Sequence, residues 1–243
     1  MIKANIKALV GIALLLSSSS LAKESEAWSY VGRTGPDKWS ELDKEFAICR
    51  EGITQSPINL DTKNLADDKV AIIFHYEPFE ITVKDYSLKI NNEPSKHIQI
   101  GAKIFKLTQF HFHMPAEHSI NNKIADAELH FVHQDKDGNL AVVGVMIKEG
   151  ESNPMIKSII ETSSKNNDTK HTLEDGNLMA LLPKDHNYFH YMGSLTTPPC
   201  TEGVNWYVMK HAIEASKAEI EALDKTIASN SRPIQKDNNR VAK

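Results

Sequence analysis

Residues 104–113 read Ile-Phe-Lys-Leu-Thr-Gln-Phe-His-Phe-His, and this stretch decides the fold. Polar and aromatic residues alternate toward its end, and a period of two is typical of a β-strand. In such a strand His111 and His113 project from one face, while Phe110 and Phe112 project from the other. The stretch therefore predicts a strand with one apolar face and with two imidazoles on the opposite face.

Similar short runs rich in Val, Ile and Phe lie on both sides of this stretch, separated by Asn, Gly, Pro and Asp clusters. This pattern indicates closely spaced strands. Helical periodicity is weaker and predicts helices over residues 154–160 and 211–229. The sequence thus predicts a mainly β protein with peripheral helices. The expected strands cover residues 70–76, 79–84, 87–90, 97–100, 104–113, 127–133 and 140–147.

The N-terminus has the features of an export signal. Lys3 and Lys7 precede an uncharged apolar run over residues 8–16, a serine-rich stretch and a small-residue pattern that ends at Ala22. These features are typical of a signal peptide cleaved after Ala22. A membrane anchor is the alternative, but a bilayer span takes about 20 apolar residues and this run is shorter.

We therefore expect residues 1–22 to be a signal peptide and residues 23–243 to form a single domain, periplasmic or secreted. Cleavage removes two lysines and no acidic residue, so the mature chain is more negative than the formal −4 of the full chain. Nucleic acid is not an expected partner of so acidic a chain. An oxidising compartment allows Cys49 and Cys200 to pair, with two free thiols as the alternative.

A second alternating stretch, Glu128-Leu129-His130-Phe131-Val132, offers a third imidazole on the same strand face as a carboxylate. Three neutral nitrogen ligands with one open position are the arrangement of a catalytic zinc site, because a structural site uses a fourth protein ligand. Zinc-binding histidines commonly donate their other ring nitrogen to a carboxylate, an amide or a carbonyl. Gln109 and Glu128 are therefore expected to hydrogen-bond the ligands.

Several further motifs stand in the chain beside these two stretches: Gln55-Ser56-Pro57-Ile58-Asn59, Glu117 and His118 after residues 109–113, residues 128–130, Gly193-Ser194-Leu195-Thr196-Thr197-Pro198-Pro199, and Arg232-Pro233-Ile234-Gln235. Together they resemble the α-carbonic anhydrase family, in order and over nearly the whole mature chain. The resemblance implies a central twisted, largely antiparallel sheet of about ten strands, peripheral helices and a cone-shaped active-site cavity. Cys49 and Cys200 fall where bacterial members of the family carry a disulfide.

The resemblance implies zinc-dependent, reversible hydration of carbon dioxide to bicarbonate and a proton, with ester hydrolysis as a side activity. The family's Zn²⁺ ligands match His111, His113 and His130, and a zinc-bound water is the nucleophile once deprotonated. Thr196 matches the threonine that accepts a hydrogen bond from the zinc-bound hydroxide and donates its own proton to a glutamate, here Glu117.

The resemblance also assigns residues around the ligands. Carbon dioxide has no net dipole, so an apolar pocket is expected, although Val and Leu on strands are by themselves typical of core. Asn230 matches a residue whose carbonyl helps to fix a zinc-binding imidazole, and Tyr30 matches a tyrosine of the cavity. The residues that match the pocket are Val132, Val142, Leu195, Thr197 and Trp206.

One position departs from the family pattern. The segment after Phe79 usually carries a histidine that moves protons between the zinc water and solvent, and this chain has Tyr86 there. A tyrosine, with an ordinary pKa near 10, cannot take up and release protons at neutral pH as an imidazole does. We therefore expect slower turnover, limited by proton release. His97 is the nearest histidine in sequence that could substitute.

The expected partner is the small molecule itself, CO₂ or bicarbonate, with no stable membrane anchor and with the chain acting as a monomer or homodimer. Two other interpretations are open. A binding or adhesion module can keep this fold without catalysis, but such relatives typically lose a zinc histidine. An unrelated zinc hydrolase could use the same ligands to attack esters.

Overall fold

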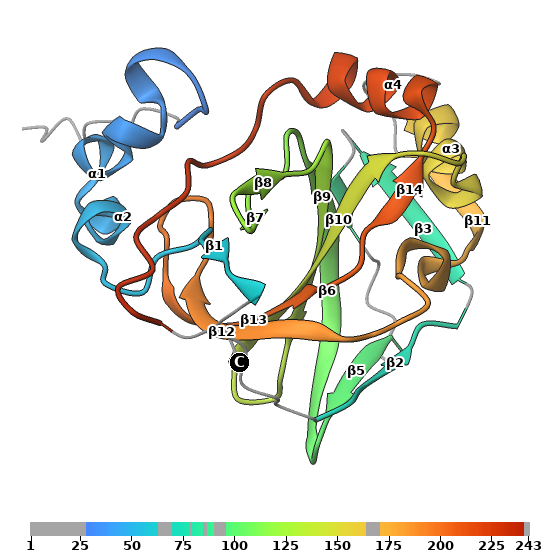
Figure 1. Ribbon diagram of the computed structural model, residues 1–243, viewed down its shortest axis with the longest axis horizontal. Helices are drawn as coiled ribbons and strands as arrows, with labels where there is room; N and C mark the ends of the chain where they lie inside the picture. The colour runs from blue at the N-terminus through green and yellow to red at the C-terminus, as the bar shows by residue number, and fades with distance from the viewer. Residues whose placement is uncertain are drawn as a thin grey trace, which may run out of the picture.

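A computed structural model describes residues 28–62, 70–77, 79–84, 87–89, 96–163 and 171–240. The expected signal peptide and Tyr86 lie outside these residues. The described chain forms a large, strongly twisted sheet with few helices, which confirms the mainly β architecture (Figure 1). No helix of the described part is long and apolar enough to cross a lipid bilayer.

Within the described residues the main sheet has 11 strands, and its central path runs β11-β3-β4-β6-β9-β10-β13-β12. A separate three-stranded sheet has the order β1-β7-β8. The strands are β1 Asn59–Leu60, β2 Ile72–His75, β3 Phe79–Lys84, β4 Ser87–Lys89, β5 His97–Ile100, β6 Lys103–His113, β7 Ser119–Ile120, β8 Lys123–Ile124, β9 Ala127–Gln134, β10 Leu140–Glu149, β11 His171–Gly176, β12 Tyr188–Ser194, β13 Glu202–Met209 and β14 Ile213–Ala215.

Most neighbouring strands of the main sheet are antiparallel, as expected, but β10 pairs in parallel with both β13 and β14. The sheet is therefore mixed. All seven predicted strands exist, with ends that differ by a few residues. Strands β11, β12 and β13 were not among the predicted ones.

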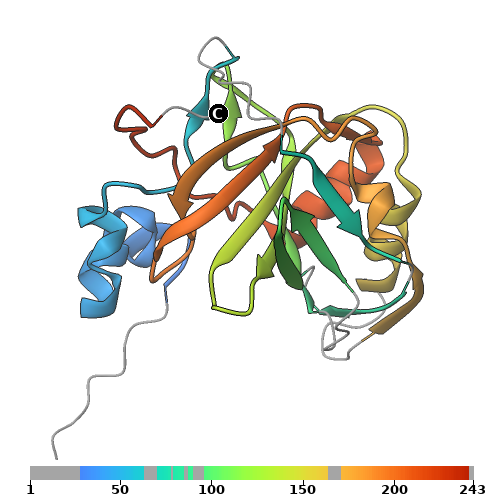
Figure 2. The same ribbon diagram turned by 90° about the horizontal axis from the view of Figure 1, so that it is seen from below.

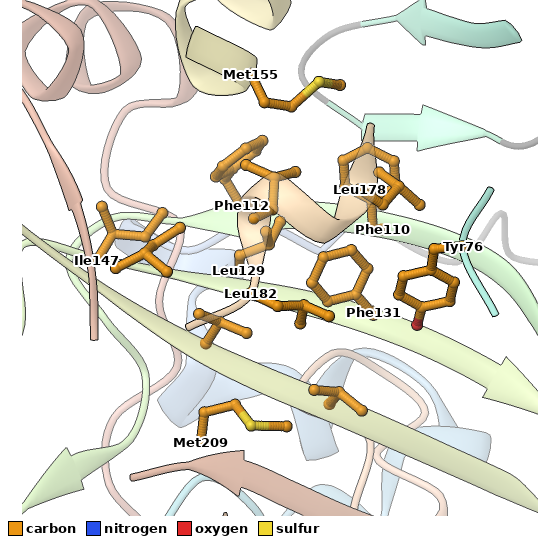
Figure 3. Packing of buried hydrophobic residues seen from close by; sticks show 14 of the residues in the cluster. Tyr76, Phe110, Phe112, Leu129, Phe131, Ile147, Met155, Leu178, Leu182 and Met209 are labelled. Carbon is orange, nitrogen blue, oxygen red and sulfur yellow. The ribbon is translucent and has the colours of Figure 1, made fainter. Parts of the chain in front are cut away.

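The two faces of the sheet bury different side chains. Phe110 and Phe112 of β6 and Leu129 and Phe131 of β9 belong to the larger core cluster. Figure 3 shows them together with Met155 of helix α3, Pro154–Ser163. The intervening residues of the same strands point to the opposite face, where a second apolar cluster lies. The period-two alternation of the sequence thus separates the apolar core from the histidine-bearing face.

Two longer helices cover the larger core cluster: α3 Pro154–Ser163 and α4 Lys217–Ile227. Short helices α1 Trp39–Leu42 and α2 Ile48–Glu51 lie at the other end of the molecule (Figures 1 and 2). The prediction of a helix from residue 211 was wrong at its start. Ile213 lies in β14, and the helix begins only after Ser216, whose side chain forms a capping box with Glu219.

A segment that we call the C-terminal strap, residues 228–240, runs from α4 back toward the N-terminal helices (Figure 1). Three hydrogen bonds from the last part of the strap, residues 235–240, attach it to residues 53–57. The donors are the backbone N–H of Gln235 to Pro57 O, Asn238 Nδ2 to Ile53 O, and Arg240 Nη2 to Gln55 O.

Candidate metal centre

Three imidazoles meet on the sheet face opposite the larger core. His111 and His113 project from β6, and His130 projects from β9, directly opposite His111 in the antiparallel register. One ring nitrogen from each of the three lies within 4.8 Å of the others. His113 and His130 are buried, and His111 is partly buried. The structure therefore brings together the three histidines that the sequence indicated.

His113 has one ring nitrogen occupied and one free. Its Nδ1–H donates to the backbone oxygen of Asn230 at 2.8 Å, which leaves the Nε2 lone pair available. That Nε2 has no hydrogen-bond partner among the described residues, and neither does Nδ1 of His111. Buried ring nitrogens without a partner are rare in proteins. Burial lowers the pKa of both histidines, so their neutral, metal-binding form is favoured.

Glu128 holds the third imidazole. Its Oε1 accepts from His130 Nε2 at 2.9 Å, and its Oε2 accepts from the backbone N–H groups of Glu117 and His118. Burial works against the charge, but contact with His118 and His130 holds the pKa of Glu128 well below its usual value. For His130, burial is likewise outweighed by the Glu128 carboxylate, which raises the pKa of the imidazole. Glu128 is thus ionised and fixes the ring of His130.

Two residues of this network were missed by the sequence reasoning. His118 Nδ1 donates to Glu128 Oε1 at 2.7 Å, and the hydroxyl of Tyr191 lies 2.7 Å from His118 Nε2 and 2.8 Å from Ser56 Oγ. All of these side chains are buried. His118 was assigned no role, and Tyr191 lies 73 residues away from it. Neither periodicity nor spacing indicates such a long-range pair.

Glu117 lies beside two of the three histidines. Its Oε2 is 3.5 Å from His113 Nε2 and has no hydrogen-bond partner among the described residues, while its Oε1 accepts from the backbone N–H of Arg232 at 2.8 Å. Thr196 is buried in the loop after β12. The described contacts include no hydrogen bond from Thr196 to Glu117, so that expected bond stays a prediction.

The loop that carries Thr196 is held at both ends. The N–H of Leu195 donates to Thr201 O at 2.9 Å, and the N–H of Cys200 donates to Thr197 O at 2.8 Å. Cys200 forms a disulfide with Cys49, across 151 residues of sequence. The expected disulfide is therefore confirmed, and it joins this loop to the N-terminal helices.

Four of the five expected pocket residues gather in one apolar cluster next to His130. Val132, Val142 and Trp206 lie side by side on β9, β10 and β13, and Leu195 packs against the same cluster. The ring centroids of Trp206 and His130 are 4.8 Å apart. An apolar surface thus borders the three imidazoles.

The remaining expected residues are Gln109, Tyr30 and Thr197, and none of them has a described hydrogen bond to the three imidazoles. Gln109 is partly buried on β6, two residues before His111, and no described hydrogen bond joins them. Tyr30 packs against Trp39 at 5.8 Å between ring centroids. Burial, and then the charge of Glu117, raises the pKa of Tyr30 well above its usual value. Thr197 is partly buried.

Comparison with known proteins identifies the family. The family model described as eukaryotic-type carbonic anhydrase matches residues 34–243. A carbonic anhydrase of Nostoc sp. is 36% identical over 247 residues, covering 96% of this chain and 94% of the relative.

Comparison with solved structures leads to the same family. The α-carbonic anhydrase of Thermovibrio ammonificans, in complex with the inhibitor sulfanilamide, superposes with a TM-score of 0.81 at 35% identity, covering 88% of this chain and 97% of that one. Dioscorin complexed with ascorbate gives a TM-score of 0.78 at 27% identity, covering 88% and 96%. The chain is therefore an enzyme of the eukaryotic-type carbonic anhydrase family.

Proposed function

We propose that this chain catalyses the reversible hydration of carbon dioxide to bicarbonate and a proton, with Zn²⁺ held by His111, His113 and His130. One observation carries the proposal: three imidazoles, two of them buried and one partly buried, converge directly beside an apolar surface. The donor set fits zinc, because three neutral nitrogens leave one coordination position for solvent. The unpartnered Nε2 of His113 and Nδ1 of His111 support the same assignment.

When bound, zinc supplies a hydroxide at neutral pH, and carbonic anhydrases are themselves the standard example of this effect. The protein residues hold the ligands in place. Asn230 and Glu128 accept the second ring N–H of His113 and His130, which fixes the tautomer and the orientation of each ring. We assign Gln109 the same role toward His111.

Thr196 and Glu117 would orient the attacking oxygen. We propose that the Thr196 hydroxyl donates to Glu117, whose Oε2 is free among the described contacts, and accepts from the nucleophile. Orientation of this kind lowers the barrier because the reacting atoms meet already aligned. Thr197 lies in the same loop as Thr196. Burial and the charge of Glu117 raise the pKa of Tyr30.

Carbon dioxide would lie on the apolar surface of Val132, Val142, Leu195 and Trp206. The substrate offers little to hydrogen-bond, so an apolar surface suits it while water is kept away. The same site would also hydrolyse activated esters, as a slower side activity.

We further propose that residues 1–22 are a signal peptide and that residues 23–243 form one exported domain, periplasmic or secreted. The Cys49–Cys200 disulfide supports an oxidising compartment. The exported chain would act on a small molecule, as a monomer or a homodimer. N-terminal sequencing of the exported protein should begin at Lys23.

The decisive experiment measures zinc content and carbon dioxide hydration on the exported protein. We expect about one zinc per chain, and loss of both zinc and activity in His113→Ala and His130→Ala. His211→Ala is the matched control, because His211 is exposed and pairs with Asp185 away from the three imidazoles. A wild-type protein that binds zinc but hydrates no carbon dioxide would instead indicate a binding module.

A further inference from the structure

Two motifs that the proposed mechanism does not use meet in the structure, and Arg232 joins them. This arginine is only 3% exposed. Its Nη1 donates to Gln55 Oε1 at 2.9 Å and to Ser56 O at 2.8 Å, and its Nη2 donates to Cys49 O at 2.7 Å. Its guanidinium also lies over the ring of Trp39. The side chain is thus fixed on every side by the N-terminal segment.

The backbone of the same residue reaches the metal centre. The N–H of Arg232 donates to Glu117 Oε1 at 2.8 Å, and this is the one hydrogen bond that the described residues give to the Glu117 carboxylate. The other oxygen of Glu117 faces His113. The position of one peptide N–H therefore sets the orientation of Glu117.

The side chain of Arg232 is also linked to the loop of Thr196. Cys49, whose carbonyl accepts from Arg232, is disulfide-bonded to Cys200, and the N–H of Cys200 donates to Thr197. Gln55 closes a second link, because its Nε2 donates to Cys200 O at 3.1 Å. Arg232 thus contacts Glu117 directly and reaches the Thr196 loop through Cys49 and Gln55.

The charge of Arg232 explains why it holds its place. Among the described residues no carboxylate oxygen lies within salt-bridge distance of its guanidinium. Burial lowers the pKa of Arg232 to about 10, partly opposed by Glu117, so the group is still charged at neutral pH. Moving a buried charge away from its hydrogen-bond acceptors costs much free energy. The guanidinium and the backbone attached to it therefore resist displacement.

We propose that Arg232 is a positioning residue for the reaction, holding the Glu117 carboxylate in register with the Thr196 loop. The inference rests on the proposed function. Its mechanism is geometric: removing the guanidinium releases the backbone at residue 232, so Glu117 loses its fixed orientation and the Thr196 hydroxyl loses its aligned acceptor. Small misplacements of this kind are costly for catalysis although the metal ligands are untouched.

The test compares Arg232→Met with Arg240→Met at a temperature where both are folded. Arg240 is a matched control because its guanidinium also binds backbone carbonyls, of Met192, Gln55, Lys236 and Asp237, and lies in the same strap without contacting Glu117. We expect Arg232→Met to lower kcat about 10- to 100-fold, with KM and zinc content unchanged. Arg240→Met should lower the melting temperature and keep kcat.

A double-mutant cycle with Glu117→Gln separates positioning from general destabilisation. If Arg232 acts through Glu117, the second substitution adds little to the first. Additive losses, or an unchanged kcat in Arg232→Met, would overturn the inference. Should Arg232→Met not fold, Arg232→Lys gives the same cycle. If the wild-type enzyme shows no hydration activity, it is the proposed function that fails, whereas an active wild type with an additive cycle refutes only the role of Arg232.

Discussion

At the scale of single residues, the metal centre depends on what occupies the second nitrogen of each imidazole. A carbonyl holds His113 and a carboxylate holds His130. The Asn230 carbonyl is uncharged and the Glu128 carboxylate stays ionised, so both only accept hydrogen bonds. His113 and His130 therefore each keep a lone pair on the other ring nitrogen, where a metal can bind. Two of the three rings are therefore already held in place for the proposed metal site.

Gly144 gives the Glu128 carboxylate the room that it needs. It lies opposite His130 on β10, and a Cβ atom there would lie 2.9 Å from Glu128 Oε1. That oxygen cannot move freely, because His118 and His130 both bind it. Gly144→Ala should therefore disturb the support of His130 and accelerate zinc loss about 10- to 100-fold, measured by transfer to a chelator.

Val145→Ala is the control for this prediction, since the next residue of β10 points into the larger core. It should lower stability through the cavity it leaves, with zinc retention unchanged. Equal zinc loss in both variants would show that the effect of Gly144→Ala is not specific to Glu128.

His133 gives a prediction about pH. It is buried on the core face, where Tyr76 donates to its Nε2 and its Nδ1–H donates to Ala141 O. Burial lowers the pKa of His133 from its usual 6.5 to about 3. Above pH 6.5 folded and unfolded chains are both neutral here, so the residue has no effect. Below it only the unfolded chain takes up the proton, and stability falls by roughly 1 kcal/mol per pH unit down to about pH 3.

Urea unfolding of the wild type and of His133→Gln, at a series of pH values between 7 and 4, would measure this contribution. The glutamine can still accept from Tyr76 but does not titrate. The stability of the wild type should therefore fall more steeply with acid than that of the variant. Parallel curves would mean that His133 does not govern the acid response.

The sequence could predict the residues whose partners are near in sequence. Alternation along single strands indicates His111, His113 and His130, and it places Glu128 on the correct face. It could not predict that His118 joins Tyr191, or that Arg232 reaches Cys49, because these contacts cross 73 and 183 residues. Only the order of strands in the sheet brings such partners together.

At the scale of elements, the wrong start of the last helix has a local cause. Ile213 fits the apolar spacing of α4, yet it pairs with Ile147 of β10, since residues 213–215 extend the sheet. Ser216 then stops the strand and caps the helix. The missed strands β12 and β13 carry polar and aromatic residues that dilute a simple apolar alternation.

The C-terminal strap should control metal retention through Asn230. The side chain of this residue accepts from the N–H of Met114 and donates to Phe112 O, which fixes the carbonyl that holds His113. Asn230→Ala should therefore release zinc about 10- to 100-fold faster. Asn238→Ala, which loses a hydrogen bond to Ile53 in the same strap, should not. Equal release rates in chelator competition would contradict a specific role for Asn230.

At the scale of the whole molecule, one face of the main sheet stabilises the fold and the other carries the candidate metal site. The core face gives stability through packed aromatic and aliphatic side chains, and the opposite face carries the imidazoles beside an apolar surface. The parallel pairing of β10 with β13 brings Trp206 next to Val142, and the disulfide ties the N-terminal helices to the same face. Distant parts of the chain thus complete a centre whose ligands come from two adjacent strands.

Turnover of the whole enzyme depends on how fast the product proton reaches solvent. We propose that Tyr86 occupies the position of the usual histidine. Protons would then leave through water alone, and a group of pKa near 7 can lose them only at about 10³ per second. Fast members of the family reach about 10⁶ per second. We therefore expect kcat, measured by stopped-flow, to rise with imidazole concentration in the wild type. Tyr86→His should raise kcat and remove the dependence on buffer, with zinc content unchanged. A wild-type rate that is already high and indifferent to imidazole would mean that another group carries the proton.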